Sequence, residues 1–109
     1  MRIRNVLVIT GLNLLLMSPL SYAAEAAKTL FTNRCQGCHG PDGKGVQTMA
    51  KALNTEIPDL TSKNTAKKSD ADLLEVVSKG KGKMPPTGGL SDKELKEIVS
   101  HVKSLSKGK

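Results

Sequence analysis

The sequence has very few aromatic residues: among its 109 residues are one Phe, one Tyr and no Trp. Aromatic side chains usually supply much of the buried area of a core, so a different large apolar body is needed here. No stretch alternates polar and apolar residues for long enough to predict a strand. A small domain without a large core often depends on a staple or a metal, and these features indicate a large bound cofactor.

Acidic residues are also scarce, with 10 Asp and Glu against 17 Lys and Arg, a net charge of +7. Such a charge is compatible with nucleic acid or with an acidic protein as partner. Nucleic acid is disfavoured because the chain has no set of aromatic side chains on which bases could stack. It is disfavoured further by the features of the N-terminal segment.

Residues 1–23 resemble a Sec-type secretory leader. Two arginines near the start precede an apolar run over residues 6–17, and Ser21-Tyr22-Ala23 in the short polar segment that follows fits an A-x-A-like cleavage site. The run is shorter than the roughly 20 residues that a membrane span requires. We therefore expect cleavage after Ala23, a periplasmic location, no stable membrane anchor and a mature domain of residues 24–109; an uncleaved N-terminal anchor is the alternative.

Helices are predicted in four segments of the mature domain. Helix formers dominate residues 25–34, and apolar residues repeat with helical spacing over 46–53, so that Met49 is expected to pack into the core. Ser69 has the position of an N-cap for a third helix, which Gly80 would end, and Ser91 with Glu94 forms a capping box for a fourth, followed by Gly108. The segment 80–89, rich in Gly and Pro, is expected to be irregular. An all-α domain with long loops follows.

The five residues Cys35-Gln36-Gly37-Cys38-His39 match C-x-x-C-H, the attachment signature of haem c. The two thiols can each form a thioether with a haem vinyl group, and His39 then lies where it can ligate the iron. A covalent haem would also supply the apolar body that the aromatic content lacks. We therefore expect one covalently attached haem c, bound through Cys35 and Cys38 with His39 as proximal ligand.

Three other interpretations of the cysteine pair are weaker. A thiol–disulfide redox site would need βαβ strands that the sequence does not predict. A zinc site usually needs four ligands, and only Cys35, Cys38, His39 and the distant His101 are present. A structural disulfide would close a loop of two residues, which restricts the unfolded chain little.

Met84, in Lys83-Met84-Pro85-Pro86, is the first candidate for the sixth iron ligand. Proline biases the residue before it towards an extended backbone, so this segment is stiff enough to hold a sulfur against the haem. His101 lies beside the apolar stripe of the last helix and is the fallback ligand. With both axial positions filled we expect one-electron transfer between Fe(III) and Fe(II) by a protein that is not an enzyme; the alternative is a haem enzyme or gas sensor with a displaceable Met84.

Beyond this motif, the chain resembles the small bacterial class I cytochromes c, which are monohaem electron carriers. The resemblance extends from Leu30-Phe31 through the motif and Pro58-Asp59-Leu60-Thr61 to Met84-Pro85-Pro86 and the capping box at Ser91. It implies three to five helices around the haem, with the first and last helices crossing, and a role for Met84 as axial ligand. Family members usually carry Trp or Tyr on the last helix at this crossing, where the present chain has His101.

Four lysines belong to segments that would surround the exposed haem edge in this fold. We expect them to steer redox partner proteins with acidic docking surfaces towards a monomeric carrier. They are Lys44, Lys79, Lys81 and Lys83.

Overall fold

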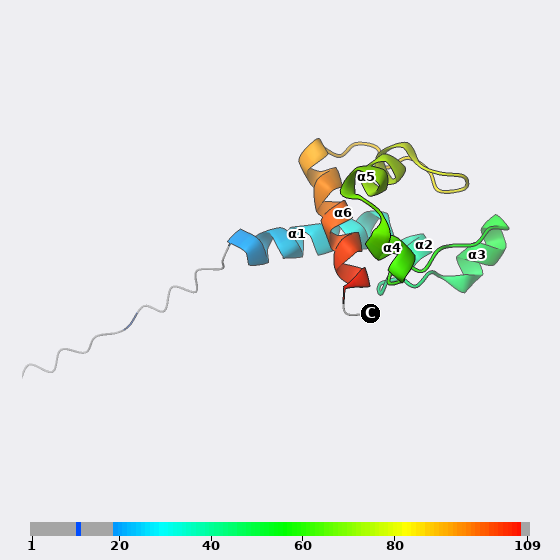
Figure 1. The fold of residues 1–109 in the computed structure, drawn as a ribbon, viewed down its shortest axis with the longest axis horizontal. Helices are drawn as coiled ribbons and strands as arrows, with labels where there is room; N and C mark the ends of the chain where they lie inside the picture. The colour runs from blue at the N-terminus through cyan, green and yellow to red at the C-terminus, as the bar shows by residue number, and fades with distance from the viewer. Residues whose placement is uncertain (1–10, 12–18, 108–109) are drawn as a thin grey trace, which may run out of the picture.

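The computed structural model describes Gly11 and residues 19–107, and the described part is helical without a strand. Its helices are α1 (Pro19–Arg34), α2 (Gln36–His39), α3 (Gln47–Leu53), α4 (Lys63–Lys67), α5 (Asp70–Lys79) and α6 (Asp92–Ser106). Figure 1 shows α6 crossing α1, with α3 at the opposite end of the molecule from the start of α1. The all-α prediction is confirmed; α2 and α4 are single turns added to the longer helices.

The helix ends follow the local sequence. The Ser69 side chain accepts a hydrogen bond from the backbone N–H of Asp72, and Ser91 and Glu94 form both hydrogen bonds of a capping box. Gly80 ends α5 as predicted, at φ +78°. Helix α1 is described from Pro19 to Arg34, so it includes residues before the expected start at residue 25.

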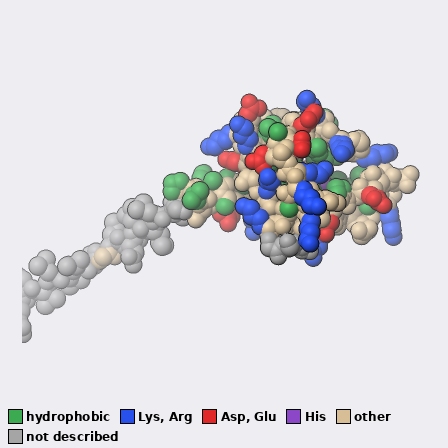
Figure 2. Space-filling model, viewed as in Figure 1, with side chains coloured by type: hydrophobic (Ala, Val, Ile, Leu, Met, Phe, Trp, Pro, Cys, Tyr) green, Lys and Arg blue, Asp and Glu red, His purple; other side chains and the backbone are tan. Residues whose placement is uncertain are grey.

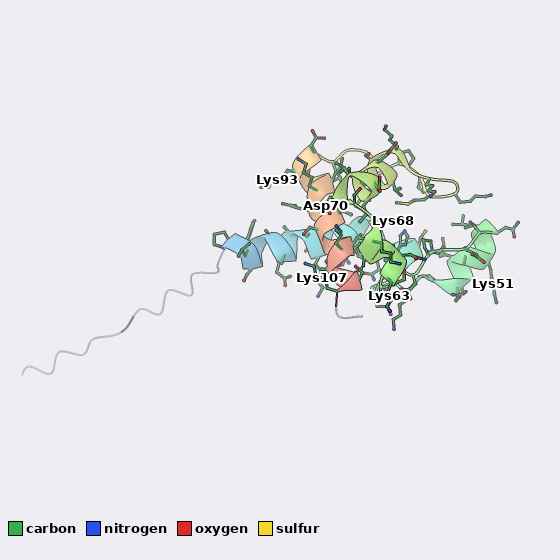
Figure 3. The ribbon with its side chains drawn as sticks, viewed as in Figure 1. Lys51, Lys63, Lys68, Asp70, Lys93 and Lys107 are labelled. Atoms are coloured by element: carbon green, nitrogen blue, oxygen red, sulfur yellow. The ribbon has the colours of Figure 1, made fainter. Side chains whose placement is uncertain are left out.

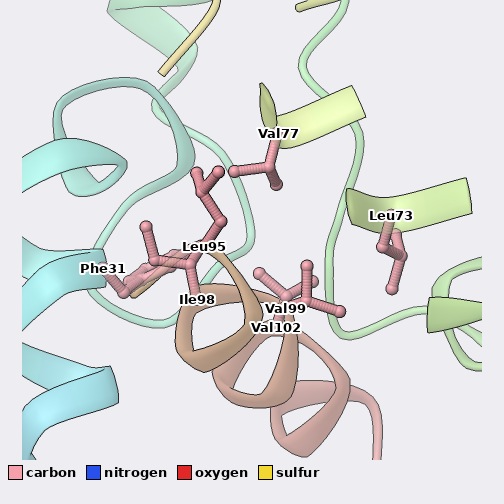
Figure 4. Packing of buried hydrophobic residues seen from close by; sticks show 7 residues of the cluster. All are labelled: Phe31, Leu73, Val77, Leu95, Ile98, Val99 and Val102. Atoms are coloured by element: carbon pink, nitrogen blue, oxygen red, sulfur yellow. The ribbon is translucent and has the colours of Figure 1, made fainter. Parts of the chain in front are cut away.

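The hydrophobic core lies between α1, α5 and α6 (Figure 4). Ile98 and Phe31 are its most buried side chains, with 0% and 1% of their surface exposed. The other members are aliphatic: Leu73, Val77, Leu95, Val99 and Val102. A core of this composition accounts for folding with a single buried aromatic residue.

Phe31 and His101 meet where α1 crosses α6. Their ring centroids lie 4.8 Å apart, and the ring planes are inclined by 48°. This is the geometry of a tilted aromatic pair. His101 thus occupies the crossing position that the family resemblance implied, and its side chain is half-buried.

The expectation that Met49 packs into the core is wrong. Helix α3 contains no buried residue, and its apolar positions Val46, Met49, Ala50 and Leu53 are half-buried. Among the described helices, α3 contacts only α2. The helical spacing was therefore correct, but the face it predicted does not reach the cluster between α1, α5 and α6.

Most of the predicted leader, and Gly108, lie outside the described residues. In the described part, residues 19–25 at the start of α1 are all exposed, and Ala27 is the first buried residue. No helix formed by residues 19–107 is long and apolar enough to cross a membrane.

Candidate haem-attachment site

The C-x-x-C-H motif forms one helical turn at the end of α1. Cys35 continues α1 by donating its N–H to the Phe31 carbonyl at 2.8 Å, and it then precedes α2. The N–H groups of Cys38 and His39 both point to the Cys35 carbonyl, at 3.3 and 3.0 Å. Residues three and four apart share one face of a helix, so both thiols and the imidazole can address one cofactor. Neither thiol is in a disulfide.

The loop after the motif folds back onto this turn. Gly45 donates its N–H to the His39 carbonyl at 2.7 Å, and Val46 donates to the Cys38 carbonyl at 2.9 Å. Gly43 accepts from the Leu60 N–H at 2.8 Å. These hydrogen bonds satisfy carbonyls that a short helix leaves free, and they fix the motif from its C-terminal side.

The motif side chains are partly withdrawn from water. Burial raises the pKa of the Cys35 thiol, although the nearby Arg34 guanidinium opposes this. Burial also lowers the pKa of His39, which favours the neutral imidazole that can bind a metal. Nδ1 of His39 is buried and has no hydrogen-bond partner. A buried imidazole left unsatisfied by protein is consistent with a ligand to haem iron.

Met84 lies on a tight reversal of the chain after α5. Its N–H donates to the Lys81 carbonyl at 2.9 Å, and its carbonyl accepts from the Lys81 N–H at 3.0 Å. Thr87 then donates to the Val77 carbonyl of α5 at 3.0 Å. Both backbone polar groups of Met84 are thus fixed, and its half-buried side chain extends from a rigid support.

Gly80 permits this reversal. Its φ is +78°, and a Cβ there would lie 2.5 Å from the Met84 carbonyl oxygen and 2.8 Å from the Pro86 nitrogen. Any larger residue would be strained and would also push the Met84 segment away. The sequence predicted Gly80 as a helix end but gave no sign of this close approach.

The motif and Met84 are held by different parts of the molecule. Helix α2 contacts α1 and α3, whereas α5, which carries the Met84 segment, contacts α6; no contact joins α5 to α2 or α3 in the described helices. The apolar positions of α3 are half-buried, so this face could be covered by a large apolar group. The donor set of two thiols, an imidazole and a thioether fits haem c.

No other metal site competes with the motif. The described residues contain no group of three or more His, Cys, Asp and Glu side chains that could hold a metal ion. A hollow of about 970 Å³ lies between α3 and residues 54–59, and its lining includes none of the predicted haem ligands. His101, the fallback ligand, packs on Phe31 at the helix crossing instead.

All four predicted docking lysines are exposed. Lys79 is the last residue of α5 and pairs with Glu75 at 3.6 Å, while Lys81 and Lys83 belong to the Met84 segment. Basic side chains are scattered widely over the visible face (Figure 2). Figure 3 labels further lysines away from the Met84 segment, among them Lys63 on α4 and Lys51 on α3. The structure therefore does not set the predicted lysines apart by charge alone.

Comparison with known proteins places the chain in a family. Residues 23–102 match the family model described as cytochrome c oxidase, cbb3-type, subunit III. The chain is 35% identical over 91 residues to the cbb3-type cytochrome c oxidase subunit FixP of Bradyrhizobium diazoefficiens, covering 81% of this chain and 29% of that protein. It is 36% identical over 88 residues to subunit FixPc of Rhizobium leguminosarum bv. viciae, covering 78% and 29%.

A solved structure is also similar. The protein titled KustC0563 c-type cytochrome aligns with a TM-score of 0.64 and 25% sequence identity, over 74% of this chain and 98% of its own. The expected cytochrome c fold is therefore confirmed. The chain spans less than a third of the length of the curated relatives, at 29% of FixP.

The relatives correct one expectation. We expected a monomer without a stable membrane anchor that meets acidic redox partners in solution. The curated relatives are instead subunits of cbb3-type cytochrome c oxidases, and a subunit works within an assembly. That expectation is wrong, because charge and an N-terminal apolar run carry no information about a permanent assembly.

The motif turn, the helix arrangement and these similarities agree on the cofactor and on the type of chemistry. One covalently bound haem c is the prosthetic group, and electron transfer is the function. The chain belongs to the family of cbb3-type cytochrome c oxidase subunit III and is a small c-type cytochrome.

Proposed function

We propose that this chain is a monohaem electron-transfer domain with His39 and Met84 as the axial ligands and Cys35 and Cys38 as the thioether links. The observation that carries the proposal is the fixed backbone of Met84, whose N–H and carbonyl are both bonded to Lys81. A ligand loop held in this way can present a sulfur with little loss of entropy on binding.

Each residue has a distinct task in this proposal. Haem c, when bound, supplies the Fe(III)/Fe(II) couple. Cys35 and Cys38 would fix the orientation of the group, while His39 would supply a neutral imidazole nitrogen and Met84 a thioether sulfur to the iron. With both of these ligands supplied by the protein, small molecules would be kept from the metal. A thioether ligand raises the reduction potential relative to a second imidazole.

An absorption spectrum of the exported protein, made with haem c maturation, tests these assignments. A sharp reduced α band that survives denaturation and extraction indicates covalent low-spin haem, and a weak red-edge band in the oxidised form indicates sulfur on iron. Met84→Ala is expected to lose the red-edge band, whereas the matched control Met49→Ala, also half-buried, keeps it. An unchanged spectrum of Met84→Ala would refute the ligand assignment.

We also propose that residues 1–23 act as a secretory leader and that the haem domain works in the periplasm. The exposed start of α1 supports this, because residues 19–23, the described end of this segment, bury no side chain that cleavage after Ala23 would remove. The mass of the exported protein tests the site: a chain that begins at Ala24 is expected, and a chain that retains residues 1–23 would contradict it.

The curated relatives suggest where the electrons go. We propose that the domain exchanges electrons with the other redox centres of a cbb3-type oxidase. Adding the reduced protein to such an oxidase is expected to give oxygen-dependent reoxidation of its haem. If the reduced protein is reoxidised no faster with the oxidase than alone in aerated buffer, this role is contradicted.

Lys81 and Lys83 are proposed to increase the positive potential at the haem edge. Replacing both by Glu should slow oxidation by a small anionic reagent such as ferricyanide about threefold at low ionic strength, and less as salt screens the charge. The matched control is Lys51→Glu with Lys93→Glu, two exposed lysines elsewhere that give the same change in net charge. Equal rates in the two double variants would show that the position of the lysines does not matter.

A further inference from the structure

Arg34 connects two regions that are far apart in the sequence. It is the last residue of α1 and directly precedes Cys35. Its guanidinium donates a hydrogen bond to the carbonyl of Gly88, which lies 54 residues further along the chain. Gly88 follows Met84 in the same loop. One side chain therefore spans from the haem-attachment turn to the segment that carries the proposed axial ligand.

The Arg34 guanidinium also influences the pKa values of groups on two different segments. It contributes to lowering the pKa of the Glu94 carboxyl, although the main causes there are hydrogen bonds with Ser91. It also opposes the rise in the pKa of the Cys35 thiol that burial produces. The positive charge of Arg34 thus lies close to the start of α6 as well as to the motif.

The remaining ties of the loop lead elsewhere. Thr87 is bonded to Val77 of α5, and Met84 is bonded to Lys81 within the loop itself. Gly88 and Gly89 have no atom within 4 Å of where a Cβ would stand, so side-chain packing at these two positions does not hold the loop. The Arg34 hydrogen bond joins this loop to the end of α1. At the other end of the loop, Leu90 packs against the hydrophobic cluster.

We propose that Arg34 is a positioning residue: its guanidinium ties the Met84 loop to the haem-attachment turn and keeps Met84 bound to the iron. This rests on the proposed function, in which Met84 is the axial ligand. A hydrogen bond from a charged donor is stronger than one between neutral groups. The planar, multi-donor guanidinium also suits a carbonyl held at a fixed distance better than a lysine ammonium does.

Competition with imidazole tests the consequence at the iron. In the oxidised, haem-loaded Arg34→Gln protein, imidazole should displace Met84 about fivefold more readily than in the wild type. Arg34→Lys, which keeps the charge, should restore only part of the difference. Lys93→Gln is the matched control, because it removes one exposed positive charge near the start of α6 without touching the loop. Its imidazole affinity should equal that of the wild type.

Hydrogen exchange in the same haem-loaded proteins tests the tie itself. The amide hydrogens of Met84 and Thr87 should exchange faster in Arg34→Gln, while those of Ile98 and Val99 in α6 stay protected. Wild-type imidazole affinity together with wild-type exchange in Arg34→Gln would overturn the proposal. If the wild type and Met84→Ala bind imidazole equally, Met84 is not the iron ligand. Faster amide exchange at Thr87 in Arg34→Gln would still show that Arg34 holds the loop, so the two proposals can fail separately.

Discussion

The two halves of this molecule are stabilised in different ways. One half is the aliphatic cluster between α1, α5 and α6, where Ile98 and Phe31 are almost fully buried. The other half comprises the segments that carry the proposed haem ligands, which are the C-x-x-C-H turn with α3 and the separately held Met84 segment. These segments are organised by backbone hydrogen bonds and by glycines at positive φ. Helix α3 buries no residue. The first half is a core made by protein alone, whereas the apolar positions of α3 in the second stay half-buried, as expected of a surface that haem would cover.

Removing the covalent attachment of haem should have the largest effect on the difference between the two halves. With Cys35→Ala and Cys38→Ala combined, we expect complete loss of covalent haem, because the chain has no other cysteine. The half around α3 should then lose order, since binding and folding are coupled when a cofactor completes the structure. Haem staining after denaturing electrophoresis and far-UV circular dichroism measure the two effects. The single variants are the controls, and each should keep one thioether.

Shortening a side chain in the protein-only core should be the next largest effect. Ile98→Ala is expected to lower the free energy of unfolding by about 2–5 kcal/mol, since it leaves a cavity at a fully buried position. Leu53→Ala on half-buried α3 is the matched control and should cost less. Urea denaturation followed by circular dichroism gives both values. Equal losses would show that the two halves do not differ in packing.

Crowding the Met84 reversal should have an intermediate effect. Gly80→Ala places a Cβ 2.5 Å from the Met84 carbonyl oxygen, at φ +78°. The expected cost is about 1–3 kcal/mol, with weakening of the red-edge sulfur band. Gly82→Ala is the control, because Gly82 also has a positive φ of +57° but has nothing within 4 Å. A sulfur band that weakens equally in both variants would show that the close approach at Gly80 is unimportant.

A substitution at the crossing of α1 and α6 should have the smallest effect on stability, and this effect depends on pH. Burial and the nearby Lys28 lower the pKa of His101 in the folded protein. The imidazole of the unfolded chain therefore binds protons more readily than that of the folded protein. The contribution of His101 to the free energy of unfolding is fully present above about pH 6.5 and decreases as the pH falls below it. His101→Phe should remove this contribution to the acid sensitivity and stabilise the crossing by about 0.5–1 kcal/mol. Thermal unfolding of both proteins at pH 7 and pH 5 measures the difference; an identical loss on acidification would contradict it.

Local chemistry explains which parts of the fold could be predicted. Ser69, Ser91 and Glu94 act within one helical turn, so their sequence positions were sufficient to place the starts of α5 and α6. Helix α4 was not predicted, because Lys63–Lys67 has no apolar repeat and its one buried residue is Thr65. The place of Met49 was predicted wrongly, since a periodic face does not reveal what it packs against.

The site shows the same division between local and distant information. The motif at Cys35, Cys38 and His39 is contiguous, and the sequence alone indicated haem c, as the comparisons confirm. The hydrogen bond from Arg34 to Gly88 joins residues 54 positions apart, and no local pattern announces it. The assignment of Met84 stays a prediction that the spectrum will decide.

Gly43 and Leu105 lie so close together that substitutions at the two positions should depend on each other. A Cβ at this position would lie 2.7 Å from Cδ1 of Leu105 and 3.3 Å from Cβ of Leu60, where the loop after the motif meets the end of α6. A side chain at Gly43 therefore requires Leu105 to change rotamer or to become smaller, and the φ of +80° favours Asn or Asp over other side chains. The cost of a substitution at position 43 should therefore depend on which residue occupies position 105.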